Sequence, residues 1–128
     1  MMNFAFYGSL RSKHYNHDRL VAPATGVVFV DTKTVLGYKL YDTGWGFPFA
    51  VKTGNTEDSI VVELFQMPES MYTDSIKRME IGAGYREEII RVKGANYTIY
   101  VRPEKATYKE AEVPGGDWTA YKTDKILT

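Results

Sequence analysis

The chain has 128 residues, a length that suits one domain built around one hydrophobic core. Hydrophobic residues make up 44% of it and charged residues 25%, as in an ordinary globular protein, and 16 basic residues balance 16 acidic ones. A duplex nucleic-acid binder would normally show a basic excess, and a membrane span would need about 18 consecutive apolar residues. We therefore expect a single domain over residues 1–128, with no nucleic-acid partner and no membrane partner.

Cysteine is absent from the sequence, which excludes a disulfide framework, a thiolate zinc site and a cysteine nucleophile. The first residues lack the basic region of a secretory signal, so we expect a cytoplasmic protein. No motif indicates a metal or a cofactor, and neither is expected.

Short runs rich in β-branched and aromatic residues predict strands along most of the chain. In chain order they lie at residues 4–7, 27–30, 34–41, 49–51, 59–66, 86–92 and 97–101. The last two flank Lys93-Gly94-Ala95-Asn96, which predicts a hairpin turn. In its second arm Tyr97, Ile99 and Val101 share one face, a period of two that fits a half-buried strand. Residues 113–118 predict a loop, with the start of a last short turn at its end.

Residues 68–82 have helical spacing instead. Ser70 suits an N-cap, and the glycine at the end of the segment is a natural stop. Tyr72, Ile76 and Met79 fall at i, i+4 and i+7, the spacing of one helical face. We therefore predict a short helix packed on a largely antiparallel sheet or barrel.

A carboxylate lies on or beside the apolar face of this predicted helix. Glu80 follows Ile76 by four residues and belongs to the last helical turn, where the helix dipole disfavours negative charge. Partial burial and the dipole both raise a carboxyl pKa, which makes a useful proton carrier near neutral pH. Alternatively the helix frays before Glu80, whose side chain then points into water or pairs with Arg78 or Arg86. Spacing alone favours this second interpretation, because the sequence fixes helix ends poorly.

The first predicted strand breaks at once into Tyr7-Gly8-Ser9-Leu10. On pattern alone this is a turn at a strand end. A functional interpretation is that the backbone N–H groups after the strand bind an anionic or carbonyl oxygen. The segment is neither a phosphate loop nor a nucleophile elbow, because the G-x-x-x-x-G-K-[ST] and G-x-S-x-G patterns are absent.

The order of four stretches resembles a known family. FYGSLR at the N-terminus, SIVVELF in mid-chain, RMEIGAGYRE and a late GGDW are together similar to the γ-glutamylcyclotransferase-like family, which includes the AIG2-like proteins. The resemblance extends from Phe4 to about Trp118, and Tyr-Gly-Ser-Leu is its most specific part. Residues 61–65 match a family strand pattern V-x-G-E-L-Y, and RMEIGAGYRE matches, imperfectly, a glutamate followed by Tyr-x-Arg. The resemblance implies an α+β fold, a small mixed β-barrel flanked by short helices.

The resemblance also implies a cyclisation. The α-amino group of a γ-glutamyl amine or γ-glutamyl amino acid attacks its own γ-carbonyl, and 5-oxoproline and an amine are the products. Glu80 stands at the position of the family's general acid/base. The Tyr-Gly-Ser-Leu loop stands where donors would hold the carbonyl oxygen or the α-carboxylate of this small metabolite. Tyr85 and Tyr121 are weaker candidates for the pocket wall and are equally suited to ordinary packing.

The chain departs from the family pattern at three places. Ile76-Lys77 replaces a common Leu-Asp, Ile81 stands where glycine is common, and Phe65 stands where tyrosine is common. These changes leave the native substrate open. Two alternatives to an enzyme therefore remain: a module that binds a small metabolite without catalysis, and a protein-interaction domain on the same fold. The presence of both Glu80 and the loop favours the enzyme.

Overall fold

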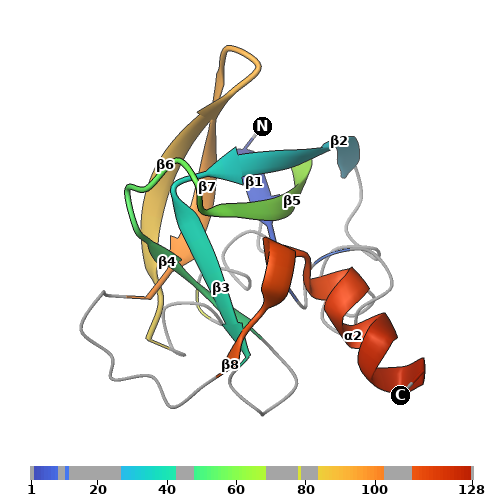
Figure 1. The fold of residues 1–128 in the computed structure, drawn as a ribbon. Helices are drawn as coiled ribbons and strands as arrows, with labels where there is room; N and C mark the ends of the chain where they lie inside the picture. The colour runs from blue at the N-terminus through green and yellow to red at the C-terminus, as the bar shows by residue number, and fades with distance from the viewer. Residues whose placement is uncertain are drawn as a thin grey trace.

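Two β-sheets and a C-terminal helix form the described part of the molecule (Figure 1). The structure is a computed structural model, and it describes residues 2–8, 11, 27–42, 48–68, 78, 84–102 and 111–127. The strands are β1 Met2–Phe6, β2 Val28–Leu36, β3 Tyr38–Asp42, β4 Pro48–Lys52, β5 Ser59–Met67, β6 Arg86–Val92, β7 Ala95–Val101 and β8 Ala111–Glu112. A short 3₁₀ helix, η2 (Pro114–Gly116), leads into the helix α2 (Trp118–Leu127).

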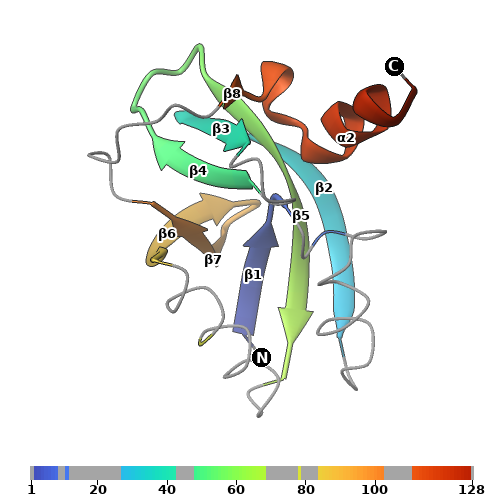
Figure 2. The ribbon, with the colours of Figure 1, turned by 90° about the horizontal axis from the view of Figure 1, so that it is seen from below.

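The larger sheet has five strands in the order β2-β5-β1-β7-β6, and the smaller has three in the order β4-β3-β8. Neighbouring strands are antiparallel except β1 and β7, which are parallel. Figure 2 shows β1, β5 and β2 side by side, with β3 and β4 lying across one end of the larger sheet. The α+β class and the largely antiparallel pairing are thus confirmed.

The larger sheet is not closed into a barrel, so that part of the expectation is wrong. Its edges are β2 and β6, and within the described residues no ladder joins them. An ion pair links them instead, between Lys93 in the β6–β7 turn and Asp31 of β2 (2.5 Å). Leu40 and Ala50 of the smaller sheet and Trp118 pack in one core with residues of the larger sheet.

The central strands of the larger sheet, β5, β1 and β7, are buried on both faces and so contribute to two cores, whereas the edge strands are partly exposed. Successive strand residues point to opposite faces, which places Phe4 and Phe6 of β1 on one side and Ala5 on the other. The first core, here the aromatic cluster, consists of Phe4, Phe6, Phe49, Val51, Phe65, Met67, Tyr85 and Tyr100. The second is mostly aliphatic and includes Leu40, Ala50, Ile60, Val62, Leu64, Ile99, Val101 and Trp118.

Strand β7 has both of its faces buried, whereas its period of two predicted only one. Tyr97, Ile99 and Val101 do share a buried face, as expected. Tyr100 on the opposite face is also buried, and its ring stacks on that of Phe4 with centroids 6.3 Å apart. The second core, which the alternation alone does not reveal, is the physical reason for the difference.

Two boundaries differ from the predicted ones because of residues with positive φ. The predicted strand 34–41 is split at Gly37 (φ 88), where the chain leaves the larger sheet and enters the smaller. The predicted four-residue hairpin turn is a two-residue turn, Lys93-Gly94, with φ values of 54 and 75. Positive φ at both central residues is the geometry that matches the twist of a tight hairpin.

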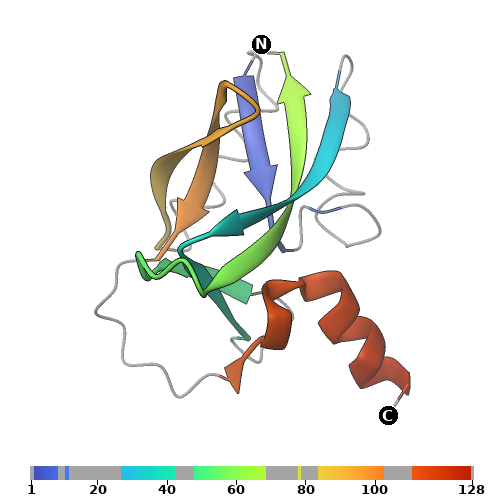
Figure 3. The ribbon, with the colours of Figure 1, turned by 45° about the horizontal axis from the view of Figure 1, so that its top comes forward.

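The C-terminal helix α2 is a full ten residues long, where the sequence predicted only a short turn. Figure 3 shows it beyond the end of the larger sheet at which β1 finishes. The helix predicted over residues 68–82 lies outside the described residues apart from Pro68 and Arg78, the latter in helical conformation. In the part of the chain that the structure describes, no helix has the length and apolar character to cross a membrane.

Candidate functional site

The end of β1 is anchored by the side chain of Tyr7. Its hydroxyl donates a hydrogen bond to the backbone carbonyl of Tyr100, at 2.6 Å, and the residue is 7% exposed. This contact ties the last residues of β1 to the neighbouring strand β7. Because the side chain belongs to the core, only the backbone of Tyr7 is left to take part in the predicted binding loop.

Gly8 and Tyr85 both lie against Pro48. A Cβ atom on Gly8 would lie 2.7 Å from both Cγ and Cδ of Pro48, the first residue of β4. Those atoms belong to a ring and cannot swing aside, so the packing requires glycine. The Tyr85 hydroxyl donates to the Pro48 carbonyl at 2.8 Å and keeps the proline in place. Two of the predicted site residues are therefore joined through a residue that the sequence analysis did not select.

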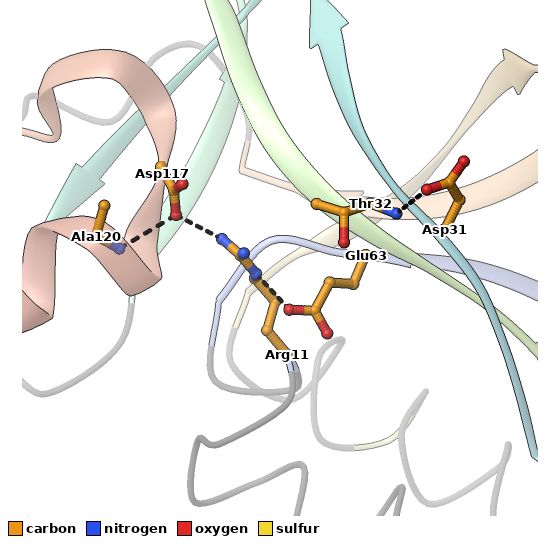
Figure 4. A network of polar contacts seen from close by, with 6 residues as sticks. All are labelled: Arg11, Asp31, Thr32, Glu63, Asp117 and Ala120. Carbon is orange, nitrogen blue, oxygen red and sulfur yellow. Dashed lines mark hydrogen bonds and ion pairs between the residues drawn. The ribbon is translucent and has the colours of Figure 1, made fainter.

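A buried ionic cluster follows the loop. Figure 4 shows Arg11 between Glu63 of β5 and Asp117 at the start of α2. Its Nε donates to Glu63 Oε2 and one of its terminal nitrogens, Nη1, donates to Asp117 Oδ1, both at 2.9 Å. Arg11 is 6% exposed and Glu63 7%. The Arg11 backbone N–H also donates to the Gly8 carbonyl at 2.9 Å, which brings the two ends of this loop segment together.

Glu63 occupies a position that suits an apolar residue. It pairs directly with Phe6 in the β1–β5 ladder and so shares its face of the sheet, next to the aromatic cluster. A carboxylate buried in such surroundings is costly unless a cation and hydrogen bonds compensate it. The guanidinium of Arg11 supplies both at once.

Asp117 accepts hydrogen bonds from both helix α2 and Arg11. It precedes the first residue of α2, and its Oδ1 accepts the backbone N–H of Ala120 at 3.2 Å, the geometry of an N-cap. Burial raises the pKa of this carboxyl, but hydrogen bonds from Arg11 and from backbone N–H groups outweigh it and hold the pKa below its ordinary value. Asp117 thus both caps helix α2 and pairs with Arg11.

Tyr121 lies one helical turn after Asp117. Its hydroxyl donates to Asp42 Oδ2 at 2.9 Å, and its ring stacks on that of Trp118 with centroids 5.6 Å apart. Asp42 is the last residue of β3 and is 7% exposed. Helix α2 is thus tied at one end to Arg11 and, a turn later, to the smaller sheet.

The structure places four predicted site residues, Tyr7, Gly8, Tyr85 and Tyr121, in one connected set of contacts. The predicted general acid/base Glu80, and Ser9 and Leu10 of the loop, lie outside the described residues.

Sequence reasoning missed the roles of Arg11, Glu63 and Asp117. One signal was available, since each belongs to a stretch that carried the family resemblance. The single carboxylate inside the apolar run SIVVELF was the clearest sign of a buried partner.

Comparison with known families decides which one the chain is part of. The family model described as gamma-glutamyl cyclotransferase, AIG2-like, matches residues 4–120. The chain belongs to this family. Three of the stretches that carry the resemblance in the sequence are joined in the structure through Arg11, Glu63 and Asp117. A search of curated proteins finds no match.

Solved structures share the cyclotransferase-like fold at low sequence identity. An uncharacterised protein of Pyrococcus horikoshii aligns with a TM-score of 0.79 and 23% identity, over 99% of this chain and 98% of its own. A structure named gamma-glutamyl cyclotransferase aligns with a TM-score of 0.57 and 14% identity, over 88% and 72%. Allophanate hydrolase of Kluyveromyces lactis matches 98% of this chain with 21% of its own length, at a TM-score of 0.74 and 14% identity. At such identities the likeness shows the fold alone.

Proposed function

We propose that the protein is a γ-glutamylcyclotransferase that converts a γ-glutamyl amine or a γ-glutamyl amino acid to 5-oxoproline and releases the amine. Glu80 is the general acid/base in this proposal. The observation that carries it is the family match over residues 4–120, which includes both the Tyr-Gly-Ser-Leu loop and Glu80. The cytoplasmic location, the small-metabolite partner and the absence of nucleic-acid and membrane partners stay predictions of the sequence.

The reaction needs few groups from the protein. The α-amino nitrogen of the substrate attacks its own γ-carbonyl carbon and closes a five-membered ring, so orientation supplies much of the rate enhancement. Glu80 takes the proton from the attacking nitrogen and returns it to the leaving nitrogen as the γ-amide bond breaks. Backbone N–H donors of the loop stabilise the negative charge that develops on the carbonyl oxygen.

The contacts around the loop support this proposal because catalysis by N–H donors depends on fixed geometry. Tyr7 is bonded to β7, and Gly8 lies against Pro48, which Tyr85 holds. Those contacts fix the point from which the loop departs.

A direct assay tests the proposal. The purified protein is incubated with γ-glutamyl amino acids and γ-glutamyl amines, and the release of 5-oxoproline is measured. We expect turnover of at least one compound. Glu80→Gln keeps the shape of the side chain and removes the base, so kcat should fall by about 10²–10⁴-fold. Glu57→Gln is the matched control, since Glu57 lies exposed in a turn and should leave kcat unchanged.

The outcomes separate the enzyme from its alternative. No 5-oxoproline from any compound, with a folded protein, would overturn the proposal and leave a non-catalytic binding module on the same fold. Equal activity of Glu80→Gln and the wild type would overturn the assignment of the base.

A further inference from the structure

We propose that Arg11 is a positioning residue, which locks the far end of the Tyr-Gly-Ser-Leu loop to β5 and to helix α2. The C-terminal helix is then part of the scaffold of the site. The catalytic meaning of this lock depends on the proposed function, whereas the lock itself does not.

The position of Arg11 in the chain places it at the far end of the loop. It is the residue that directly follows the Tyr-Gly-Ser-Leu motif, and its backbone N–H is bonded to the Gly8 carbonyl. Tyr7 and Pro48 restrain the near end of the loop. Arg11 restrains the far end, so the two ends are held by independent contacts from different strands and from a helix.

The guanidinium of Arg11 is planar and rigid, and its nitrogens donate in fixed directions. Nε is bonded to Glu63 and a terminal nitrogen to Asp117, carboxylates that lie 52 and 106 residues further along the chain. Two anchors in different directions restrain both the position and the orientation of the side chain. A lysine ammonium at this position would carry the charge without that rigid fork.

The buried ion pair between Arg11 and Glu63 is not explained by stability alone. Such a pair is often no more stabilising than apolar residues of similar volume, because desolvation offsets the attraction between the charges. An apolar residue at position 63 would also suit the neighbouring aromatic cluster. The charged side chains add directional hydrogen bonds. These bonds restrain the position of the Arg11 backbone more strictly than apolar packing would. A fixed backbone is what a loop of N–H donors requires.

The test breaks the lock and keeps the helix cap. In Asp117→Ser, serine is as good an N-cap as aspartate, but its short, uncharged side chain cannot form the ion pair with Arg11. The control is Glu112→Ser, which removes an acidic side chain from an exposed ion pair with Lys39, outside both the loop and the hairpin. Amide hydrogen exchange of the peptide covering residues 6–12 is measured by mass spectrometry, with the β6–β7 hairpin as internal reference. Activity is measured as kcat and KM across pH.

The expected result is local. In Asp117→Ser, exchange in residues 6–12 becomes about three- to tenfold faster, and exchange in the hairpin is unchanged. In Glu112→Ser, exchange is unchanged in both segments. With the best substrate kcat falls by a similar or larger factor, while the shape of the pH profile is unchanged, because Asp117 transfers no proton. Arg11→Lys is a second variant, which keeps the charge and should reproduce both effects.

Every other result contradicts a specific part of the proposal about Arg11. Unchanged exchange in residues 6–12 in both variants would show that Arg11 does not lock the loop. Faster exchange with unchanged kcat and KM would show that the cluster is merely structural. If the wild type turns over no substrate, the proposed function fails, and the exchange measurements still decide whether the lock exists.

Discussion

At the scale of single residues, the glycine of the Tyr-Gly-Ser-Leu loop has a steric role beside the suggested chemical one. The sequence allows two interpretations of Gly8, a simple turn or a residue that frees backbone donors. The structure adds that a Cβ would lie 2.7 Å from two ring atoms of Pro48. Contacts this short force a shift of backbone or ring, which is the overpacking that destabilises cores.

Gly8→Ala should therefore lower the free energy of unfolding by about 1–3 kcal/mol, measured by urea denaturation. The double variant Gly8→Ala/Pro48→Ala tests the cause, since alanine at position 48 lacks the two ring atoms involved. It should be more stable than the sum of the two single effects predicts. Strict additivity of the two changes would show that the contact with Pro48 is not what excludes a side chain from position 8.

The ionic cluster makes a second prediction at this scale. Arg11→Met removes the cation that Glu63 bonds while Glu63 stays buried, and it should cost about 3–5 kcal/mol in urea denaturation. Arg11→Met/Glu63→Met replaces both charges by side chains of similar size and should recover most of that loss. A double variant as unstable as the single one would mean that the directional bonds themselves carry the stability.

Sequence reasoning could name the stretches that hold Arg11, Glu63 and Asp117 but could not pair these residues. Periodicity describes neighbours within a few positions, whereas these partners are 52 and 106 residues apart. Only the order of strands in the sheet brings β1 beside β5 and both to the start of α2. For the same reason, the connection of Gly8 to Tyr85 through Pro48 was invisible in the sequence.

At the scale of elements, strands were easier to predict than the last helix. Alternating and β-branched runs located most strands to within a few residues, because the pleat imposes a period of two. Helix α2 was underestimated because its stabilisation is largely tertiary. Trp118 is fully buried and stacks on Tyr121, and the Lys122 ammonium lies 5.2 Å from the indole centroid. The Asp117 cap was the local signal for a helix start.

The turn before α2 supplies a prediction with an internal control. Gly115 and Gly116 both have positive φ (73 and 65), so alanine is strained at either. They differ in space, since a Cβ on Gly116 would lie 2.1 Å from the Ser59 carbonyl oxygen and one on Gly115 would meet nothing within 4 Å. Gly115→Ala should cost about 1–2 kcal/mol.

Gly116→Ala should cost clearly more than Gly115→Ala, because the backbone of β5 must move as well. Chemical denaturation of the two variants checks the order. Equal losses would show that backbone strain alone, and not the close approach to β5, explains why glycine stands at position 116.

At the scale of the whole molecule, the larger sheet curves without closing. Its edge strands are linked by Lys93, which reaches from the β6–β7 turn to Asp31 on β2. A bulge in β2 between Phe29 and Asp31 lies next to this contact, and bulges increase the local bend of a strand. The family resemblance predicted the α+β class correctly, but the closed barrel that it also implied is wrong, because β2 and β6 stay unpaired edges within the described residues.

This link between the edges has a pH dependence of known sign. The hydrogen bond from Lys93, followed by that from the Thr32 backbone, lowers the pKa of Asp31 from 3.8 to about 2. A carboxyl whose pKa is lower in the folded state stabilises that state above its unfolded pKa. The stabilisation disappears as the pH falls from about 3.8 through about 2.

The thermal midpoint of the wild type should exceed that of Asp31→Asn at neutral pH, and the difference should shrink between pH 4 and pH 2. Lys93→Gln should show the same trend, because it removes the other half of the pair. A difference that persists undiminished at pH 2 would mean that Asp31 contributes through packing and not through its charge.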